Sequence, residues 1–213
     1  MPLTLTGQPP TKEPCHDRTK WATVVSVTTV AEQRRLTLAE WAVLGLLGCG
    51  PQHAFALVKS LARNGGLGRI WSVPTPVVYR AVNTLREDGL IEDVGEERSE
   101  SGPPRTLLAI TGVGKRRLNA WLRLPVKHMR DVRSELMLKL AILARLHRSP
   151  EALVNAQRKT FAPILNGLEA TVKSAEAAGK FELTLARWRL ESGRAVLRFL
   201  DQLRQPAAPS TRQ

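Results

Sequence analysis

Apolar positions recur at helical spacing in residues 75–88, TPVVYRAVNTLRED, and predict a short helix with its own boundaries. Thr75 is expected to cap the first turn, and Pro76 suits the next position because its missing N–H costs nothing there. Asp88-Gly89 predicts the end of the helix, since glycine adopts the left-handed conformation that terminates helices. The predicted core stripe comprises Val78, Ala81, Val82 and Leu85.

A second face of the same helix carries polar side chains that its core does not need. These side chains belong to Tyr79, Arg80, Asn83 and Arg86. For a lone helix, a solvated surface is the more ordinary explanation of such a face. The neighbouring elements therefore have to decide whether the face has a function.

Two helices are predicted before this one. Thr37 is expected to cap a mostly buried helix in LAEWAVLGLLG, and the following GCGP at 48–51 predicts a tight turn. A second helix is predicted over 52–63. Its inward-facing residues are expected to be Phe55, Val58 and Leu61.

A β-hairpin is predicted after the third helix. Its strands, 90–94 and 105–110, are joined by the polar tip GEERSESGPP. Thr111 is expected to cap a further helix that ends at Pro125. Three short helices followed by a hairpin are the order of a winged helix-turn-helix domain, which we place at 36–124.

This order of elements favours a nucleic-acid function for the polar face. In a winged helix-turn-helix the third helix is presented outward, and a DNA major groove about 12 Å wide admits one helix with donor-rich side chains. The amides at the start of the helix suit a phosphate, and arginines of the hairpin suit the DNA backbone or the minor groove. The predicted DNA-contact residues are Thr75, Tyr79, Arg80, Asn83, Arg86, Arg98 and Arg105.

The second half of the chain has a different pattern. One amphipathic helix is predicted over 126–147, a second helical segment over 151–178 with Pro163 expected to kink or divide it, and a last helix from residue 181. The apolar stripes of these helices must pack against each other or against a second subunit. An intramolecular bundle is therefore an alternative to the dimerisation domain that we place at 125–205. The predicted dimerisation residues are Met129, Val132, Leu136, Leu140, Leu143, Leu185, Trp188, Val196 and Phe199.

Composition narrows the class of protein. The chain has 213 residues and a formal net charge of +13, which makes polyanions plausible partners. Residues 125–213 hold +8 of this charge, so net charge alone does not locate a DNA site. Two cysteines, Cys15 and Cys49, are too few for a disulfide scaffold and fit a reducing compartment. No apolar run has transmembrane length, so we expect a cytoplasmic protein with no membrane partner.

Four stretches within 36–124 resemble the PadR family of bacterial transcriptional regulators. They are LTLAEWAVLGLL, GPQHAFALVKSL, GRIWSVPTPVVYRAVNTLREDGLI and GPPRTLLAITGVGKRRLNAWL. The stretch VRSELMLKLAIL at 132–143 is similar to the start of the C-terminal helical domain in the longer subfamily, which includes virulence-gene activators. The whole resemblance covers about 36–204.

The resemblance implies a winged-helix domain, a helical dimerisation domain and a sequence-specific regulatory role. It also implies roles for Tyr79 in the recognition helix, Gly89 at its end and Arg105 in the wing. The chain departs from the family at Ala54-Phe55, where Gly-Tyr is usual. A second departure is Thr106-Leu107-Leu108, where the wing usually carries basic residues and Tyr, so this wing is expected to grip DNA less strongly.

No stretch of the sequence predicts catalysis, a cofactor or a metal site. GGLGRI at 65–70 and GVGKRR at 112–117 lack the spacing of nucleotide-binding loops. The four histidines are scattered, and only Cys15-His16 are neighbours. Trp41, Trp71 and Trp121 are expected in the core or at a domain junction, with an aromatic pocket for a small-molecule effector as the alternative.

The sequence thus predicts a mainly α protein with a small β-hairpin, built as a winged helix-turn-helix domain followed by a long-helix dimerisation domain. Residues 1–35 are expected to be a partly disordered extension and 206–213 a disordered tail. The expected function is a homodimeric regulator, a repressor, that binds an inverted-repeat operator in double-stranded DNA. The alternatives are a non-specific basic nucleoid protein and a helical protein–protein adaptor.

Overall fold

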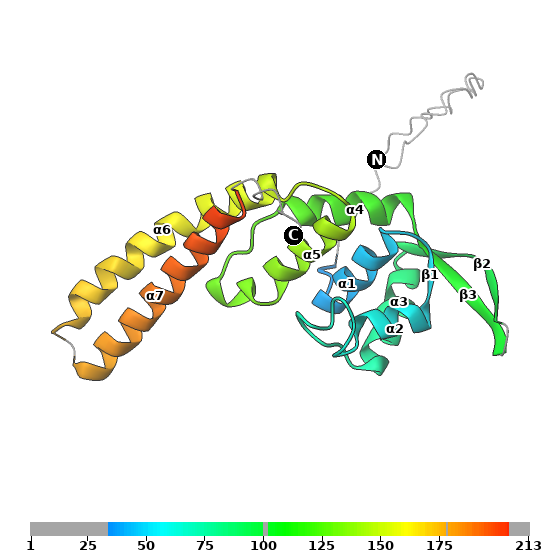
Figure 1. Cartoon of the computed structure of the whole chain (residues 1–213), viewed down its shortest axis with the longest axis horizontal. Helices are drawn as coiled ribbons and strands as arrows, with labels where there is room; N and C mark the ends of the chain where they lie inside the picture. The colour runs from blue at the N-terminus through cyan, green and yellow to red at the C-terminus, as the bar shows by residue number, and fades with distance from the viewer. Residues whose placement is uncertain (1–33, 100–101, 178, 205–213) are drawn as a thin grey trace, which may run out of the picture. The chain divides into compact units, whose positions relative to one another are not determined.

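The computed structural model describes residues 34–99, 102–177 and 179–204 (Figure 1). The predicted tail, and all but the last two residues of the predicted N-terminal extension, lie outside these ranges. The described chain is mainly helical with one small antiparallel sheet, which confirms the predicted fold class.

The first half contains the predicted helix, helix, helix, hairpin and helix. Its elements are α1 (Leu38–Leu47), β1 (Gln52–His53), α2 (Ala54–Leu61), α3 (Thr75–Glu87), β2 (Ile91–Ser99), β3 (Gly102–Ile110) and α4 (Gly112–Arg123). The strands lie in the order β1-β3-β2, and both pairs are antiparallel. This is the winged helix-turn-helix order, with a third strand added to the predicted hairpin.

Helix α1 lies at the centre of the core. Its N-terminus is closed by a capping box, in which the Glu40 amide donates to the Thr37 hydroxyl at 3.3 Å and the Glu40 carboxylate accepts from the Thr37 amide at 2.6 Å. Ala42, Val43 and Leu44 have no exposed surface. Helices α3, α4 and α5 and strand β3 all pack against α1, so this helix fixes where the other elements of the domain lie.

The third strand replaces the first turn of the predicted second helix. Gln52 and His53 pair with Leu108 and Leu107 of β3, so α2 begins at Ala54 and not at residue 52. The His53 ring is the physical reason, because its Nδ1 accepts a hydrogen bond from the Ala56 amide at 3.0 Å and caps the helix there.

The hairpin strands are longer than the sequence predicts. They extend beyond the predicted 90–94 and 105–110, and the register runs from Ile91 opposite Ile110 to Ser99 opposite Gly102. Residues 92–97 of β2 are all exposed, so this strand has no alternation of buried and exposed side chains to mark it in the sequence. The pairing register shifts between Asp93 and Gly95, and Gly95 has a φ of +153°. A bulge of this kind interrupts the two-residue periodicity by which a strand is recognised in a sequence.

The second half consists of η1 (Met129–Val132), α5 (Glu135–Arg145), α6 (Glu151–Ala175) and α7 (Lys180–Gln202). The prediction of one helix over 126–147 is therefore wrong. Both backbone groups of Val126 are hydrogen-bonded by the Gln157 side chain of α6, which holds this residue outside any helix. Pro163 lies inside α6, at an exposed position, and does not divide it.

Helices α6 and α7 lie side by side (Figure 1). Arg194 of α7 donates to Glu169 of α6 at 3.0 Å and to Glu191 at 2.8 Å. The hydrogen bond to Glu169, followed by the one to Glu191, raises the pKa of the Arg194 guanidinium above its usual range. Gly193 of α7 is buried and lets α7 approach Leu165 of α6 closely.

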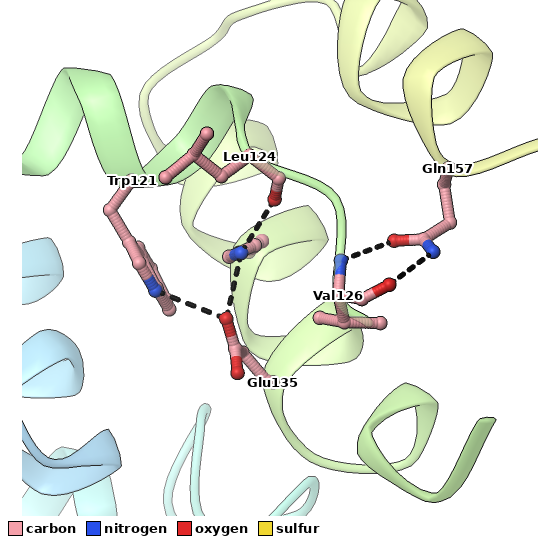
Figure 2. Close-up of polar contacts among 6 residues, drawn as sticks. Trp121, Leu124, Val126, Glu135 and Gln157 are labelled. Atoms are coloured by element: carbon pink, nitrogen blue, oxygen red, sulfur yellow. Dashed lines mark hydrogen bonds and ion pairs between the residues drawn. The ribbon is translucent and has the colours of Figure 1, made fainter. Parts of the chain in front are cut away.

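A buried lysine joins α4 to α5. Figure 2 shows two of the groups that it contacts, Leu124 and Glu135. Lys139 is 1% exposed; its ammonium donates to the Leu124 carbonyl at 2.7 Å and lies 2.8 Å from Glu135 Oε1. The same carboxylate oxygen accepts from Trp121 Nε1 at 3.2 Å, and the ammonium lies 4.7 Å from the centre of the Trp121 ring. Burial lowers the pKa of Lys139, against the opposing effect of its hydrogen bond to Glu135.

A second buried polar contact joins this junction to α6. The Gln157 side chain, which has no exposed surface, accepts from the Val126 amide at 2.8 Å and donates to the Val126 carbonyl at 2.9 Å (Figure 2). The buried apolar residues of both halves, from Leu36 in the first to Leu200 in the second, form one cluster in space. The two halves share this core, and the division into domains at 124/125 stays a prediction.

The tight packing of α5 on α1 generates a stability prediction. A methyl group at Gly45 would overlap Ile142, which is fully buried and has no free space to move into. Gly45→Ala is expected to lower the free energy of unfolding by about 1–3 kcal/mol, measured by urea denaturation. Gly167→Ala in α6 is the control, because no atom lies within 4 Å of its added methyl group. It should raise stability by about 0.5–1 kcal/mol, and an equal rise for both variants would contradict the close α1–α5 contact.

Candidate nucleic-acid interface

Helix α3 separates its buried stripe from its polar face as predicted. Val78 and Leu85 have no exposed surface, and α3 packs on α1 and α2 through this side. Tyr79 is 42% exposed, and Arg80, Asn83 and Arg86 are also exposed. We call these four residues the reading face. Its tyrosine, arginine and amide groups are the side-chain types that contact phosphates and base edges.

The start of α3 differs by one residue from the prediction. The amides of Val77 and Val78 donate to the Pro74 carbonyl at 2.9 and 3.2 Å, so Pro74 is the N-cap and no side chain caps the helix. The prediction of a Thr75 cap is therefore wrong, because the first turn already closes on the residue before it. Thr75 is the first helical residue and is exposed, so its contact with a phosphate stays a prediction.

The C-terminal end of α3 agrees with the sequence. Asp88 is the C-cap residue, and Gly89 follows at φ +65°, in the left-handed region that glycine adopts without strain. The Leu90 amide donates to the Leu85 carbonyl at 2.9 Å and completes the turn. This ending leads the chain directly from α3 into β2.

Arg86 is held by a partner that the sequence did not indicate. Its Nε and Nη2 donate to Asp93 Oδ1 of β2 at 3.1 and 3.0 Å, and its Nη1 donates to Asn83 Oδ1 at 3.4 Å. The Arg86 guanidinium is thus directed toward the wing and its charge is balanced there. Arg80 makes no ion pair with any residue that the structure describes.

Arg105 of the wing stacks on an aromatic ring of α2. Its guanidinium carbon lies 5.3 Å from the centre of the Phe55 ring. Phe55 is 55% exposed, so the prediction that it faces inward is wrong. Leu57 and Leu61, four residues apart, form the buried side of α2, and Phe55 lies about 200° around the helix from Leu57. Arg98 lies in β2, but its side chain is outside the described part of the chain.

A hollow of about 400 Å³ joins the reading face to the wing. Three of the four reading-face residues line it together with Arg105, whereas Arg80 and Thr75 lie outside the lining. The lining residues are His53, Ala54, Phe55, Tyr79, Val82, Asn83, Arg86, Arg105, Thr106 and Leu108. The fold therefore brings together predicted contact residues from two separate stretches of sequence.

Strand β2 is acidic, which weakens the expected role of the wing. Glu92, Asp93, Glu96 and Glu97 are all exposed, and carboxylates repel a phosphate backbone. Glu97 lies opposite Arg105 in the sheet and 3.8 Å from His53 Nε2. The unpaired positive charge on this side of the domain is therefore limited. Most of the contacts that hold a nucleic acid would then have to come from α3.

The predicted dimerisation residues fall into three groups. Leu136 and Leu143 are buried inside the chain, where α5 packs on the core, so their side chains are not open to a partner. Trp188 is 67% exposed and Leu185 is half-buried. The remaining residues pack against the core with part of their surface exposed: Met129, Val132, Leu140, Val196 and Phe199.

Other candidate sites can be checked only within the described residues, and Cys15-His16 lies outside them. In the described residues no three His, Cys, Asp or Glu side chains are grouped so that they could hold a metal ion. No helix in the described ranges is long and apolar enough to cross a membrane. Trp41 and Trp121 stack on each other at 4.6 Å with ring planes 7° apart, as expected for residues of the core or a domain junction. Trp71 is 37% exposed, so its prediction as a core residue is wrong, and a small-molecule effector stays a prediction.

Residues 43–120 match the sequence model of the Transcriptional regulator PadR-like family. The match runs from α1 into α4 and includes the reading face, and it confirms the resemblance to the PadR family within residues 36–124. The resemblance of the C-terminal helices to the longer subfamily stays a prediction. The family is one of transcriptional regulators and not of enzymes. A search of curated proteins found no significant match.

Solved structures also resemble the chain. Bacillus subtilis PadR in complex with operator DNA is 21% identical, with a TM-score of 0.41, and the match covers 78% of this chain and 97% of that one. A Streptococcus mutans UA159 protein is 15% identical, with a TM-score of 0.37 and coverage of 76% and 96%. These TM-scores lie below 0.5, so the assignment rests on the family match and on the fold described above.

The Arg86–Asp93 pair generates a prediction for binding to random duplex DNA. Asp93→Asn removes a negative charge and releases Arg86 toward the phosphates, so affinity should rise and the slope of log K against log salt should steepen by about one. Fluorescence anisotropy at several salt concentrations measures both quantities. Glu92→Gln removes the same charge from the same strand without breaking an ion pair, so its effect should be smaller. Equal effects of the two variants would show that Arg86 is not restrained by Asp93.

Proposed function

We propose that this protein is a sequence-specific DNA-binding transcriptional regulator that reads the major groove with α3. The observation that carries the proposal is the reading face: four exposed residues with hydrogen-bonding side chains on a helix whose other side is buried, inside the region that matches the PadR-like family. A similar protein, Bacillus subtilis PadR, has been solved in complex with operator DNA.

Each residue of the reading face has a role that its chemistry suggests. Arg80 suits a bidentate contact with guanine O6 and N7, and Asn83 suits adenine N6 and N7. Tyr79 at the rim of the hollow and Thr75 at the start of the helix suit phosphate oxygens and set the register. Arg86, Arg98 and Arg105 are assigned to the DNA backbone beside the groove, with Asp93 limiting the reach of Arg86.

The protein acts as a homodimer in this proposal, with α7 as the contact surface. Leu190 of α7 is buried, whereas Trp188 lies about 200° from it around the helix, and Phe181 lies on nearly the same side as Trp188. These two aromatic side chains are 67% and 74% exposed, and their spacing of seven residues puts them on one face. A two-fold dimer needs such a self-complementary apolar surface, and an inverted-repeat operator would mirror its symmetry.

In this proposal the protein is a repressor and has no catalytic activity. It works in the cytoplasm, where the operator is. It also assigns the C-terminal helices to the longer PadR subfamily with a helical dimerisation domain. The alternative is a non-specific nucleoid protein, which the net charge of +13 favours. The acidic β2 strand and the ion pair at Arg86 argue against it, because both reduce the positive charge near the reading face.

Substitutions on the reading face test base recognition. Arg80→Ala and Asn83→Ala should each cost about 1–3 kcal/mol on a selected site and relax base preference at one position. Selection of bound duplexes from a random pool gives the site, and titration of that site and a random duplex gives the ratio of affinities. Arg189→Ala, on an exposed position of α7, removes the same charge as Arg80→Ala and should leave the ratio unchanged. An unchanged ratio for Arg80→Ala would rule out α3 as the reader.

The exposed aromatic face of α7 generates a prediction about assembly. The wild-type chain is expected to sediment as a dimer at micromolar concentration, and Phe181→Ser with Trp188→Ser should shift it to the monomer because the apolar contact is lost. Val94→Ser with Val113→Ser, at residues 49% and 48% exposed outside α7, is the control and should stay dimeric. A dimer that survives the loss of both aromatic side chains would place the interface elsewhere.

A further inference from the structure

Phe55 is a large apolar side chain that the proposed contacts with DNA do not use. It lies in the first turn of α2 and is largely exposed, whereas Leu57 and Leu61 bury the other side of that helix. A single exposed apolar residue is common on protein surfaces, so the surroundings of Phe55 have to show whether it has a role.

The Phe55 ring is one wall of the hollow of about 400 Å³ that joins the reading face to the wing. Val82 of α3 and Leu108 of β3 also line this hollow, and both are buried, so they form its floor. Helix α2 packs against both α3 and β3, which brings the three side chains together. The hollow therefore presents an apolar surface built from three elements.

Polar and aromatic groups surround this apolar surface. Asn83 directly follows Val82 in α3 and is exposed, so a base edge that Asn83 contacts lies beside the floor of the hollow. The Arg105 guanidinium carbon lies 5.3 Å from the centre of the Phe55 ring, and the His53 ring lies 6.2 Å from it with the planes 26° apart. These two contacts restrict the orientation of the phenyl ring before DNA binds.

The major groove of DNA offers one apolar group to such a surface. Base edges present hydrogen-bond donors and acceptors there, and the 5-methyl group of thymine is the exception. If Asn83 contacts adenine N6 and N7, the paired thymine presents its methyl group on the same groove edge. The sugar–phosphate backbone fits the hollow less well, because the Glu97 carboxylate lies 3.8 Å from His53 Nε2 and repels phosphates.

We infer that this hollow receives the 5-methyl group of a thymine and that Phe55 is a specificity-determining residue for that base. The thymine lies in the A·T pair that Asn83 contacts or in a pair next to it. The hollow is larger than a methyl group, so the C5–C6 edge of the pyrimidine enters with it. The inference rests on the proposed function and adds a preference that the hydrogen bonds of the reading face do not supply.

Exchange of thymine for uracil in the selected duplex tests the inference on the full chain. Deoxyuridine lacks only the 5-methyl group and keeps the base pairing. Each thymine is replaced in turn, and affinity is titrated by fluorescence anisotropy. One thymine in each half-site should lose about fourfold in affinity, the value of one buried methyl group, and the others should lose clearly less. If no exchange lowers affinity, the inference is wrong, while the proposed function stands because a duplex was selected.

Variants at Phe55 decide which side chain contacts the methyl group. The readout is the ratio of affinities for the thymine and uracil duplexes, which a general loss of binding does not change. Phe55→Ala should lower this ratio from about four to about one, and Phe55→Leu should keep most of it because leucine is apolar. Val113→Ala removes an exposed apolar side chain from α4 and should leave the ratio unchanged. A ratio that persists in Phe55→Ala would assign the methyl group to another residue and overturn the inference.

A gain of affinity is the complementary test. At the position that responds to uracil, a C·G pair replaces the T·A pair, and 5-methylcytosine then restores only the methyl group. This methyl group should raise the affinity of the wild type about fourfold and leave that of Phe55→Ala unchanged. An equal rise in both proteins would contradict a contact with Phe55.

Two further outcomes separate the inference from the proposed function. If the wild-type ratio is one and Phe55→Ala weakens both duplexes, the ring contacts the sugar–phosphate backbone and the inference is wrong. If no duplex is selected, random duplexes made with thymine and with uracil are compared. Equal affinity for these two would show that the proposed function and the inference both fail, whereas a thymine preference that requires Phe55 would support the methyl contact alone.

Discussion

The buried ammonium group of Lys139 is the interaction on which the junction between the two halves of the chain depends. It closes the carbonyl end of α4 at Leu124 and balances its charge with Glu135. A buried ammonium without these partners would be strongly destabilising, so α4 and α5 can pack only in an arrangement that supplies both. The Trp121 ring covers the ammonium and stacks on Trp41, which extends this requirement to α1. The polar junction and the apolar core thus favour the same packing.

The position of the reading face follows from the same core. Because α1 is surrounded by α3, α4, α5 and β3, α3 can bury only the stripe that includes Val78 and Leu85. The opposite side of α3 is left to solvent, and its polar residues are therefore presented without any contact that has to be broken before binding. The exceptions lie at Arg86, which joins α3 to β2 through its ion pair with Asp93 and also donates a hydrogen bond to Asn83 Oδ1.

The sequence predicts local structure better than it predicts partners. The stripe of α3 and the caps at Thr37 and Thr111 were predictable, because each depends on residues three or four positions apart. The length of β2 was not, because a strand exposed over most of its length shows no alternation. Neither the Asp93 partner of Arg86 nor the Leu124 partner of Lys139 could be predicted. These pairs join different elements, and nothing in the local pattern shows which elements pack together.

The positive charge is distributed unequally between the two halves of the chain. Residues 125–213 hold +8 of the net +13, while the wing strand beside the reading face is acidic. A protein that bound DNA mainly by charge would place its excess cations around α3, where the phosphates lie. Here part of the excess instead surrounds a hollow between α6 and α7, close to Gln157 and its contact with Val126. In the proposed function, affinity at α3 then depends more on hydrogen bonds to base edges than on general electrostatic attraction.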